Sequence, residues 1–185
     1  FNLNKNYEVI QDPNSAELLI DWAITMSPTS ITVISGEETT TIHGEVYWAD
    51  HTPNPGPDPD IWAQLGYGPR DTDPSLGGWT WKNATYNQQV ANNHEYISNL
   101  KIDIPGKYAY CYRFSNDGGE TWLYADTQGT APNFADPYVI SDQGILTVNY
   151  NSTAPFTVDY LGNGDYTWKD LEQILFNKNI AVFNI

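Results

Sequence analysis

The feature that most constrains the fold is an alternation of apolar and polar residues that recurs through the middle of the chain. Between residues 42 and 48 every second position is apolar or glycine, and these positions are Ile42, Gly44, Val46 and Trp48. Successive side chains of a β-strand point to opposite faces, so this spacing places the four residues on one face of a strand. Similar strand-like runs occur at 20–26, 31–34, 61–67, 79–82, 95–102, 107–114, 121–125 and 144–150.

Turn-forming residues separate these runs, and no helical period lies between them. Ser27-Pro28, Asp73-Pro74 and Pro105-Gly106 are examples of the Pro, Gly and Asp pairs that end a strand. Short strands at this spacing predict an all-β protein, an immunoglobulin-like antiparallel β-sandwich. The loop at 50–60 holds four of the 12 prolines and several acidic residues, so we expect it to be stiff and exposed.

The C-terminal part has a different pattern. Leu171, Ile174 and Leu175 show the i, i+3, i+4 spacing of a helix, which predicts a short helix over 171–177. The sequence therefore predicts a lead-in over 1–17, a sandwich module over 18–150 and an appendage over 155–185.

Composition limits the classes of partner. The 185 residues include 8 Lys and Arg against 23 Asp and Glu, a formal net charge of −15. A nucleic-acid binder needs a basic face that this chain cannot assemble. No apolar run approaches the ~20 residues that span a bilayer, and residues 1–7 lack the pattern of a signal peptide. Few charged residues and many Asn, Thr, Tyr and Trp are typical of secreted β-proteins, so we expect an extracellular or cell-surface location.

The cysteine content is consistent with a secreted bacterial protein. Cys111 is the single cysteine of the sequence, which rules out an internal disulfide and a thiolate metal cluster. It lies in the strand-like run 107–114, so we interpret it as a small buried apolar residue. Because bacterial surface proteins often have large cores and no disulfides, this favours a prokaryotic source.

One turn matches a known motif at each fixed position. Ser115, Asp117, Gly119, Thr121 and Trp122 fit the pattern Ser-x-Asp-x-Gly-x-Thr-Trp of the Asp-box. We expect a hairpin in which the Asp117 carboxylate accepts N–H groups of the turn and Trp122 packs beneath it. The motif resembles the turns of sialidase propellers, but a single copy cannot form a propeller, so we interpret it as a structural turn.

Five segments together resemble an immunoglobulin-like accessory module of secreted bacterial proteins. They are GEVYW at 44–48, AQLGYG at 63–68, WTWKNATYN at 79–87, NNHEY at 92–96 and PGKYAYCYRFS at 105–115. The resemblance covers roughly 21–148 and implies a module found beside extracellular nucleases, polysaccharide-degrading enzymes and surface proteins. The loop at 50–60 departs from the family pattern, because it is longer and more acidic. Fold analogy of this kind assigns no ligand.

A second resemblance lies in the appendage, where residues 159–170 are similar to an EF-hand or dockerin calcium loop. Its oxygen donors would be Asp159, Asn163, Asp165, Thr167 and Asp170. Gly164 occupies the sharp turn, and the predicted helix follows the loop. Leu161 stands where a further ligand is expected and cannot bind metal. The resemblance implies calcium as a cofactor, with the acidic loops at 50–73 as a second choice, while a plain turn that leads into a helix remains the alternative.

Catalytic patterns are absent from the sequence. His43, His51 and His94 are scattered, and no metalloprotease, serine-hydrolase or phosphate-loop motif occurs. Carboxylates are too numerous for the sequence to single out a glycosidase pair. The loop acids are more typical of solvated or calcium-bound groups, and these are Asp58, Asp60, Asp71 and Asp73. We therefore predict that the chain is not an enzyme.

Aromatic residues offer the clearest binding hypothesis. Sugar rings need flat apolar surfaces with amides nearby. The candidate carbohydrate-binding residues lie in one segment and are Trp79, Trp81, Tyr86 and Asn83, with Asn87 and Gln88 close by. We expect Trp79 and Trp81 to point to the same face of a strand. The remaining candidates, Trp48, Trp62 and Trp122, are expected to belong to the core.

Two functional hypotheses follow. The first is a non-catalytic structural or surface module of a secreted prokaryotic protein, stabilised by calcium, with neighbouring domains of its parent protein as partners. The second is a carbohydrate-binding module of a secreted polysaccharide-degrading enzyme, with a polysaccharide as partner. The sequence favours the first slightly. An exposed aromatic platform would favour the second.

Overall fold

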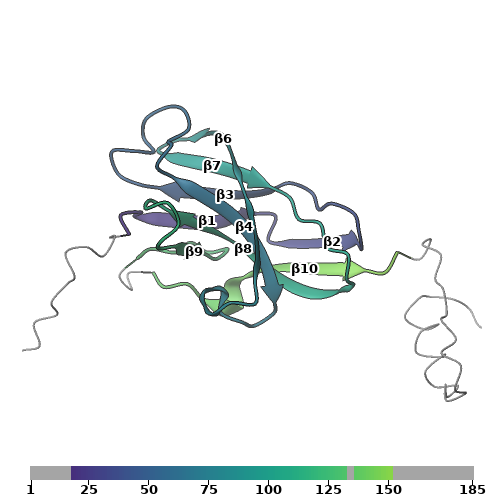
Figure 1. The fold of residues 1–185 in the computed structure, drawn as a ribbon. Coiled ribbons are helices and arrows are strands. Elements are labelled where there is room, and N and C mark those ends of the chain that lie inside the picture. Colours follow the sequence, from purple (N-terminus) through teal and green to yellow (C-terminus); the bar gives the residue numbers. More distant parts are fainter. Residues whose placement is uncertain (1–17, 133–135, 152–185) are drawn as a thin grey trace, which may run out of the picture.

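The structure is a computed structural model that describes residues 18–132 and 136–151. These residues form two packed β-sheets joined by loops, with two three-residue 3₁₀ turns, η1 (Pro74–Leu76) and η2 (Ile140–Asp142) (Figure 1). The prediction of an all-β sandwich is confirmed. Within the described residues, no helix is long and apolar enough to cross a membrane. The lead-in 1–17 and the whole appendage 155–185, with its EF-hand-like loop 159–170 and its predicted helix, lie outside the described residues.

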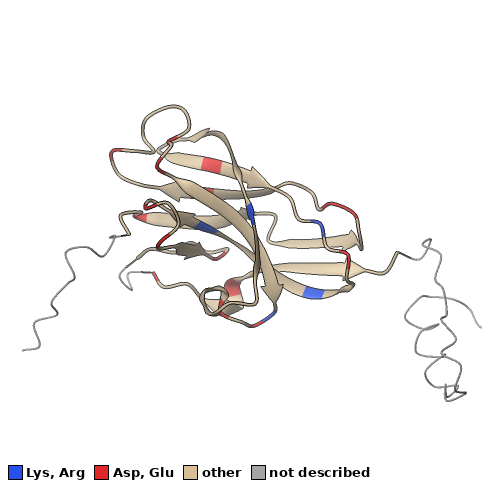
Figure 2. Ribbon diagram, viewed as in Figure 1, with Lys and Arg blue, Asp and Glu red and all other residues tan. Residues whose placement is uncertain are grey.

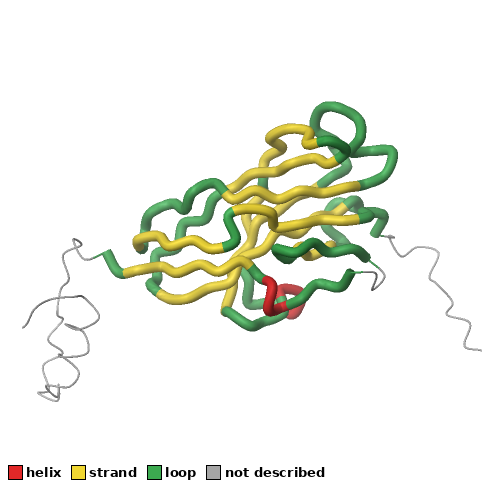
Figure 3. The backbone as a smooth tube through the Cα atoms, turned by 180° about the vertical axis from the view of Figure 1, so that it is seen from behind, coloured by secondary structure: helices red, strands yellow, loops and turns green. Residues whose placement is uncertain are grey.

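The strands divide into a four-stranded and a six-stranded sheet. The first sheet has the order β1 (Trp22–Ser27), β3 (Ile42–Tyr47), β7 (Asn93–Ser98), β6 (Thr85–Val90). The second has the order β2 (Ser30–Ile34), β10 (Gly144–Asn149), β8 (Gly106–Ser115), β4 (Trp62–Pro69), β5 (Thr80–Asn83), and β9 (Leu123–Ala125) also pairs with β8. Figure 3 shows the loops that join the strands at both ends of the sandwich.

The strand order is that of an immunoglobulin-type sandwich. Strands β1, β3, β7 and β6 take the places of A, B, E and D, and β10, β8 and β4 those of G, F and C. The pairs are antiparallel except β2 with β10, which is parallel. The chain passes from β1 in the first sheet to β2 in the second at Ser27-Pro28, whose peptide bond is cis. The Tyr108 hydroxyl donates to the Ile104 carbonyl at 2.9 Å, as in the tyrosine corner of such sandwiches.

The two sheets meet over the inner side of β8. Tyr110, Tyr112 and Phe114 alternate along this strand and are fully buried. The Tyr112 ring lies against Gly44 of the facing sheet, where an added Cβ atom would stand 2.6 Å from the ring. The Tyr112 hydroxyl also donates to the Ile42 carbonyl at 2.7 Å. The glycine predicted to lie on the apolar face of its strand therefore permits the close approach of the sheets.

Several sequence-predicted boundaries were wrong. The strand predicted at 95–102 ends at Ser98. Leu100 and Ile102 lie in the loop that follows, and their side chains are buried in the core. The run at 121–125 begins as a strand at Leu123, since the two residues before it belong to the turn. Strand β6 was missed, because its sequence Thr-Tyr-Asn-Gln-Gln-Val has little apolar alternation.

Acidic residues lie mainly in loops and turns, as Figure 2 shows. Among the described acids only Glu45 and Glu95 lie in strands, and they face each other in register on β3 and β7. Glu95 accepts the side-chain amides of Asn87 and Gln88, and Glu45 accepts that of Asn93. These donors stabilise two carboxylates that are each only 5% exposed.

Candidate functional site

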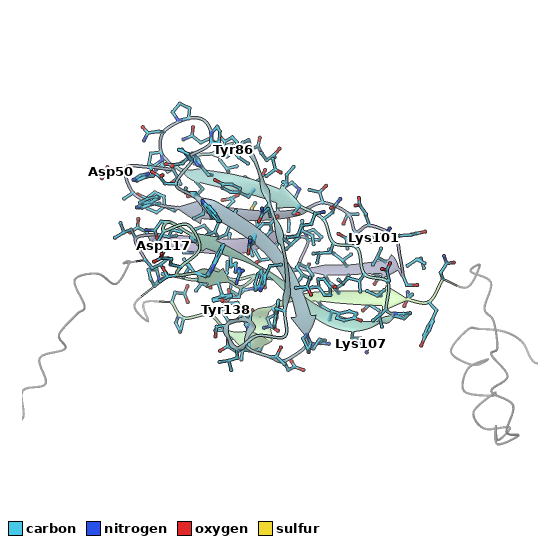
Figure 4. All side chains as sticks on the ribbon, in the orientation of Figure 1. Asp50, Tyr86, Lys101, Lys107, Asp117 and Tyr138 are labelled. Carbon is cyan, nitrogen blue, oxygen red and sulfur yellow. The ribbon has the colours of Figure 1, made fainter. Side chains whose placement is uncertain are left out.

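A cleft of about 320 Å³ opens beside the loop at 50–60, where the chain passes from β5 of one sheet to β6 of the other. Its lining combines an aromatic ring, two side-chain amides and a carboxylate, supplied by Trp62, Gln64, Asn83 and Asp58, with Tyr86 and Tyr96 at its base. Figure 4 shows Tyr86 at the end of the molecule that also carries Asp50. Apolar and hydrogen-bonding groups thus converge on one hollow of the surface.

Trp62 is the exposed aromatic residue of this cleft. It opens β4, pairs with Ser115 and keeps 50% of its surface accessible. Its neighbours Ala63 and Leu65 turn inward and are buried. The prediction that Trp62 is core was therefore wrong, because alternation along β4 places it on the outward face. Trp48, by contrast, is buried in the core as predicted, and Trp122 is half-buried.

The two amides of the cleft are held in a fixed arrangement. Gln64 Nε2 donates to Asn83 Oδ1 at 2.9 Å. Gln64 Oε1 in turn accepts Arg113 Nε at 2.9 Å and Arg113 Nη2 at 2.6 Å. Because these bonds use the oxygen of the exposed Asn83 side chain, its N–H groups stay available to hydroxyl groups of a ligand.

Asp58 supplies the negative charge at the rim. Burial alone would raise the pKa of Asp58, but the Asp60 backbone N–H and the His51 imidazole outweigh it and lower this pKa. Asp58 Oδ1 accepts the Asp60 N–H at 2.9 Å, and Asp58 Oδ2 lies 2.7 Å from His51 Nδ1. The side chain is therefore a carboxylate at neutral pH.

The sequence-predicted aromatic group is divided between two places. Asn83 and Tyr86 line the cleft, where the Tyr86 ring packs edge-on against His94 and Tyr96. Trp79 and Trp81 instead pack on β4, the strand that pairs with β5, and are half-buried. The structure does not bring all four residues together. Asn83 at the end of β5 and Tyr86 on β6 of the facing sheet meet at the cleft, whereas Trp81 lies farther along β5, opposite Gly66.

Trp79 and Trp81 each lie over a glycine of β4. The two side chains point to the same face of the sheet, as predicted from their spacing of two residues. A Cβ atom added to Gly68 would stand 2.6 Å from the Trp79 ring, and one added to Gly66 would stand 2.3 Å from the Trp81 ring. The two indoles are stacked at 5.7 Å with an angle of 19°.

The guanidinium of Arg113 lies between two tryptophans, 4.0 Å from the ring centres of both Trp81 and Trp122. Tyr124 packs against Trp81 from the same side of the sheet, with ring centres 5.8 Å apart. These contacts engage Trp81 within the protein, so it offers less surface to a ligand than Trp62 does.

The hairpin at 115–122 lies directly beside Trp62. Asp117 accepts the backbone N–H groups of Glu120 and Thr121 at 2.9 to 3.0 Å and the Ser115 hydroxyl at 2.6 Å. Trp122 Nε1 donates to the Gly119 carbonyl at 2.9 Å. A Cβ atom added to Gly119 would lie 3.0 Å from Trp122 and 3.7 Å from Trp62. The hairpin therefore supports one side of the Trp62 ring.

Three further residues considered from the sequence do not line the cleft, and they are Cys111, Asp71 and Asp73. Cys111 is fully buried, as expected, and burial raises the pKa of its thiol to about 12. Asp71 is exposed, while Asp73 caps η1 by accepting the Ser75 N–H at 2.8 Å. The residues predicted to bind calcium lie outside the described residues, and they are Asp159, Asn163, Asp165, Thr167 and Asp170.

Comparison with known proteins gives partial matches to two enzymes, while no protein-family model matches the chain. The chain is 30% identical over 197 residues to an amylopullulanase of Thermoanaerobacterium thermosulfurigenes, covering 89% of this chain and 10% of that protein. It is 32% identical over 171 residues to an amylopullulanase of Thermoanaerobacterium saccharolyticum, covering 77% of this chain and 13% of that protein. The chain thus spans about a tenth of the length of these relatives, and it is similar to one segment of a much larger enzyme.

Proposed function

We propose that this chain is a non-catalytic accessory module of a larger, secreted polysaccharide-degrading enzyme, and that its cleft binds an α-glucan. The observation that carries this proposal is Trp62, a half-exposed indole beside the amide of Asn83 and the carboxylate of Asp58. An indole face packs on the C–H side of a sugar ring, and amides and carboxylates bond its hydroxyl groups.

The comparisons support the same proposal. The matched segment is about a tenth of each relative, which suits an accessory region better than a whole catalytic domain. The name amylopullulanase points to amylose-type glucans and pullulan as the polymers to test first. The acidic, Tyr- and Trp-rich composition favours an extracellular location and argues against nucleic acid as a partner.

Affinity electrophoresis of the full chain tests the proposal. We expect migration to slow in gels that contain soluble starch or pullulan. Trp62→Ala should weaken binding on the order of 1–3 kcal/mol, the loss of one stacking platform. Asn83→Ala should cost about 0.5–1.5 kcal/mol, the value of a hydrogen bond. Circular dichroism should show that both variants stay folded, because both side chains are exposed.

Tyr150→Ala is the matched control, since Tyr150 is a 45% exposed aromatic residue that does not line the cleft. Its retention should equal that of the unchanged chain. Retention that survives Trp62→Ala but is lost in Trp79→Ala would place the sugar on the outer face of β5 instead. Equal migration in all gels would contradict carbohydrate binding.

The second candidate is a structural module that spaces neighbouring domains. It is favoured by the packing of Arg113 between Trp81 and Trp122, which uses aromatic surface for internal contacts. Absence of binding to any glucan, together with a lower melting temperature of Trp81→Ala, would support this function over the first.

We also propose that calcium stabilises the chain through the loop 159–170. The support is the ligand pattern of that loop and the net charge of −15, whose self-repulsion a divalent cation relieves. At a hundredfold excess over its dissociation constant, calcium would add about 2.7 kcal/mol to the free energy of unfolding. The melting temperature should rise with calcium, fall with chelator and lose this response when Asp159 and Asp170 are both replaced by Ala. A response that survives the double substitution would contradict this site.

A further inference from the structure

A second group of polar side chains lies at the rim of the cleft, in the loop between β3 and β4. His51, Asp58 and Asp60 each offer one ligand atom, and these atoms all lie within 4.8 Å of one another. The shortest separation is 2.7 Å, between His51 Nδ1 and Asp58 Oδ2. An imidazole nitrogen and two carboxylate oxygens therefore converge from positions up to nine residues apart.

The imidazole of His51 is held in place by the protein. Its ring stacks on Trp48 with centres 3.4 Å apart and an angle of 5°. The His51 N–H donates to the Trp48 carbonyl at 3.1 Å, and the His51 carbonyl accepts Asn54 Nδ2 at 3.1 Å. A ligand that is already oriented loses little conformational freedom when an ion binds.

The loop carries several acidic residues and no Lys or Arg of its own. Residues 48–69 contain no Lys or Arg, and Figure 2 shows the loop without basic residues. The Asp58 side chain is only 14% exposed, and its carboxylate oxygens face the His51 imidazole and the Asp60 backbone N–H. The loop thus brings together two carboxylates and the His51 imidazole, residue types that bind metal ions in proteins.

We propose that His51, Asp58 and Asp60 bind a divalent transition-metal ion, for which Zn²⁺ is the probe. One nitrogen and two carboxylate oxygens suit zinc and its neighbours, whereas calcium takes oxygen ligands almost exclusively. Zinc holds such ligands at about 2.0–2.2 Å, so tetrahedral ligands lie roughly 3.4 Å apart. His51 and Asp58 need therefore separate by less than about 1 Å, and the hydrogen between them moves to Nε2. Water would complete the coordination.

An ion at this position would tie the proline-rich loop together at three points. Asp58 also lines the cleft, so the ion would fix one wall of it. The inference does not depend on carbohydrate binding, because its ligands and its test involve metal alone.

Calorimetric titration of the chelator-treated full chain with Zn²⁺ tests the site. We expect saturable binding that weakens at least about tenfold in Asp60→Asn, the effect expected for loss of a ligand. Asp60 is exposed, and it contributes a backbone N–H but no side-chain bond to the loop, so this variant should fold normally. His51→Gln should also lose binding. Ca²⁺ should bind these residues more weakly than Zn²⁺.

His43→Gln is the matched control. The His43 side chain is 34% exposed, like that of His51, and its Nδ1 lies 3.2 Å from a carboxylate oxygen of Glu95, but among the described residues no third ligand joins them. Zn²⁺ binding should be unchanged in His43→Gln and in the double Ala variant of Asp159 and Asp170. The proposal is overturned by absence of saturable Zn²⁺ binding, by equal loss in the control, by binding that survives in both Asp60→Asn and His51→Gln, or by tighter binding of Ca²⁺ at these residues.

Discussion

Replacement of Asp117 by Asn should destabilise the hairpin at 115–122 by an amount that depends on pH. The carboxylate accepts two backbone N–H groups and the hydroxyls of Ser115 and Thr121. Burial alone would raise the pKa of Asp117, but these hydrogen bonds outweigh it and lower the pKa from 3.8 to about 2. Asparagine keeps the shape and loses the charge and one acceptor oxygen.

The size of the effect follows from that pKa. At about 1.36 kcal/mol per unit, a shift from 3.8 to about 2 corresponds to roughly 2.4 kcal/mol of stabilisation of the charged form. Asp117 is only partly buried, so solvent screening reduces this value, and we expect a loss of about 1–2 kcal/mol at pH 7.

Urea unfolding of both proteins from pH 7 down to the lowest pH at which they fold is the assay. The pKa of the folded state lies below that of the unfolded state, so the stabilisation is complete well above pH 3.8 and disappears as the pH falls through about 2. The difference in unfolding free energy between the two proteins should therefore narrow on acidification.

Glu120→Gln is the control, because Glu120 is an exposed acid of the same turn. Its backbone N–H donates to Asp117, but its side chain does not, so the substitution leaves that bond in place. Its unfolding free energy should change by less than about 0.5 kcal/mol. A similar loss in the control would refute the reasoning, and so would an Asp117→Asn difference that stays constant as the pH falls.

Three further predictions concern the core and the corner of the sandwich. Gly44→Ala should lower the free energy of unfolding by about 1–3 kcal/mol, since the new Cβ atom would stand 2.6 Å from the Tyr112 ring. Chemical denaturation measures this free energy, and an unchanged value would contradict the close approach of the two sheets. Cys111 should be inert to a thiol reagent at about pH 8 in the native chain, since burial raises the pKa of its thiol to about 12. It should react fully in denaturant, and rapid labelling of the native chain would contradict its burial. Tyr108→Phe should cost about 1 kcal/mol through loss of the hydroxyl bond to the Ile104 carbonyl, and a melting temperature that does not fall would argue against that bond.

Local patterns were enough to predict much of the fold. The alternation around Gly44 and along 107–114 predicted β3 and β8, because a period of two is a property of the strand itself. The residues of the Asp117 turn could be identified for the same reason, since the bonds of that turn span at most four positions in the chain. Strand β6 escaped prediction because its partner strand, rather than its own composition, holds it in place.

The site depended on tertiary structure. Alternation assigned Trp62 to a face of β4, but only the packing of two sheets decided which face is covered, and the outward one is half-exposed. Asn83 and Tyr86 belong to different sheets and both line the cleft, whereas Trp81, on the same strand as Asn83, packs against Arg113 and does not line it. His51 and Asp58 meet because the loop folds back between them. Sequence determines which side chains a segment offers, whereas burial and convergence depend on contacts between segments that are distant in the chain.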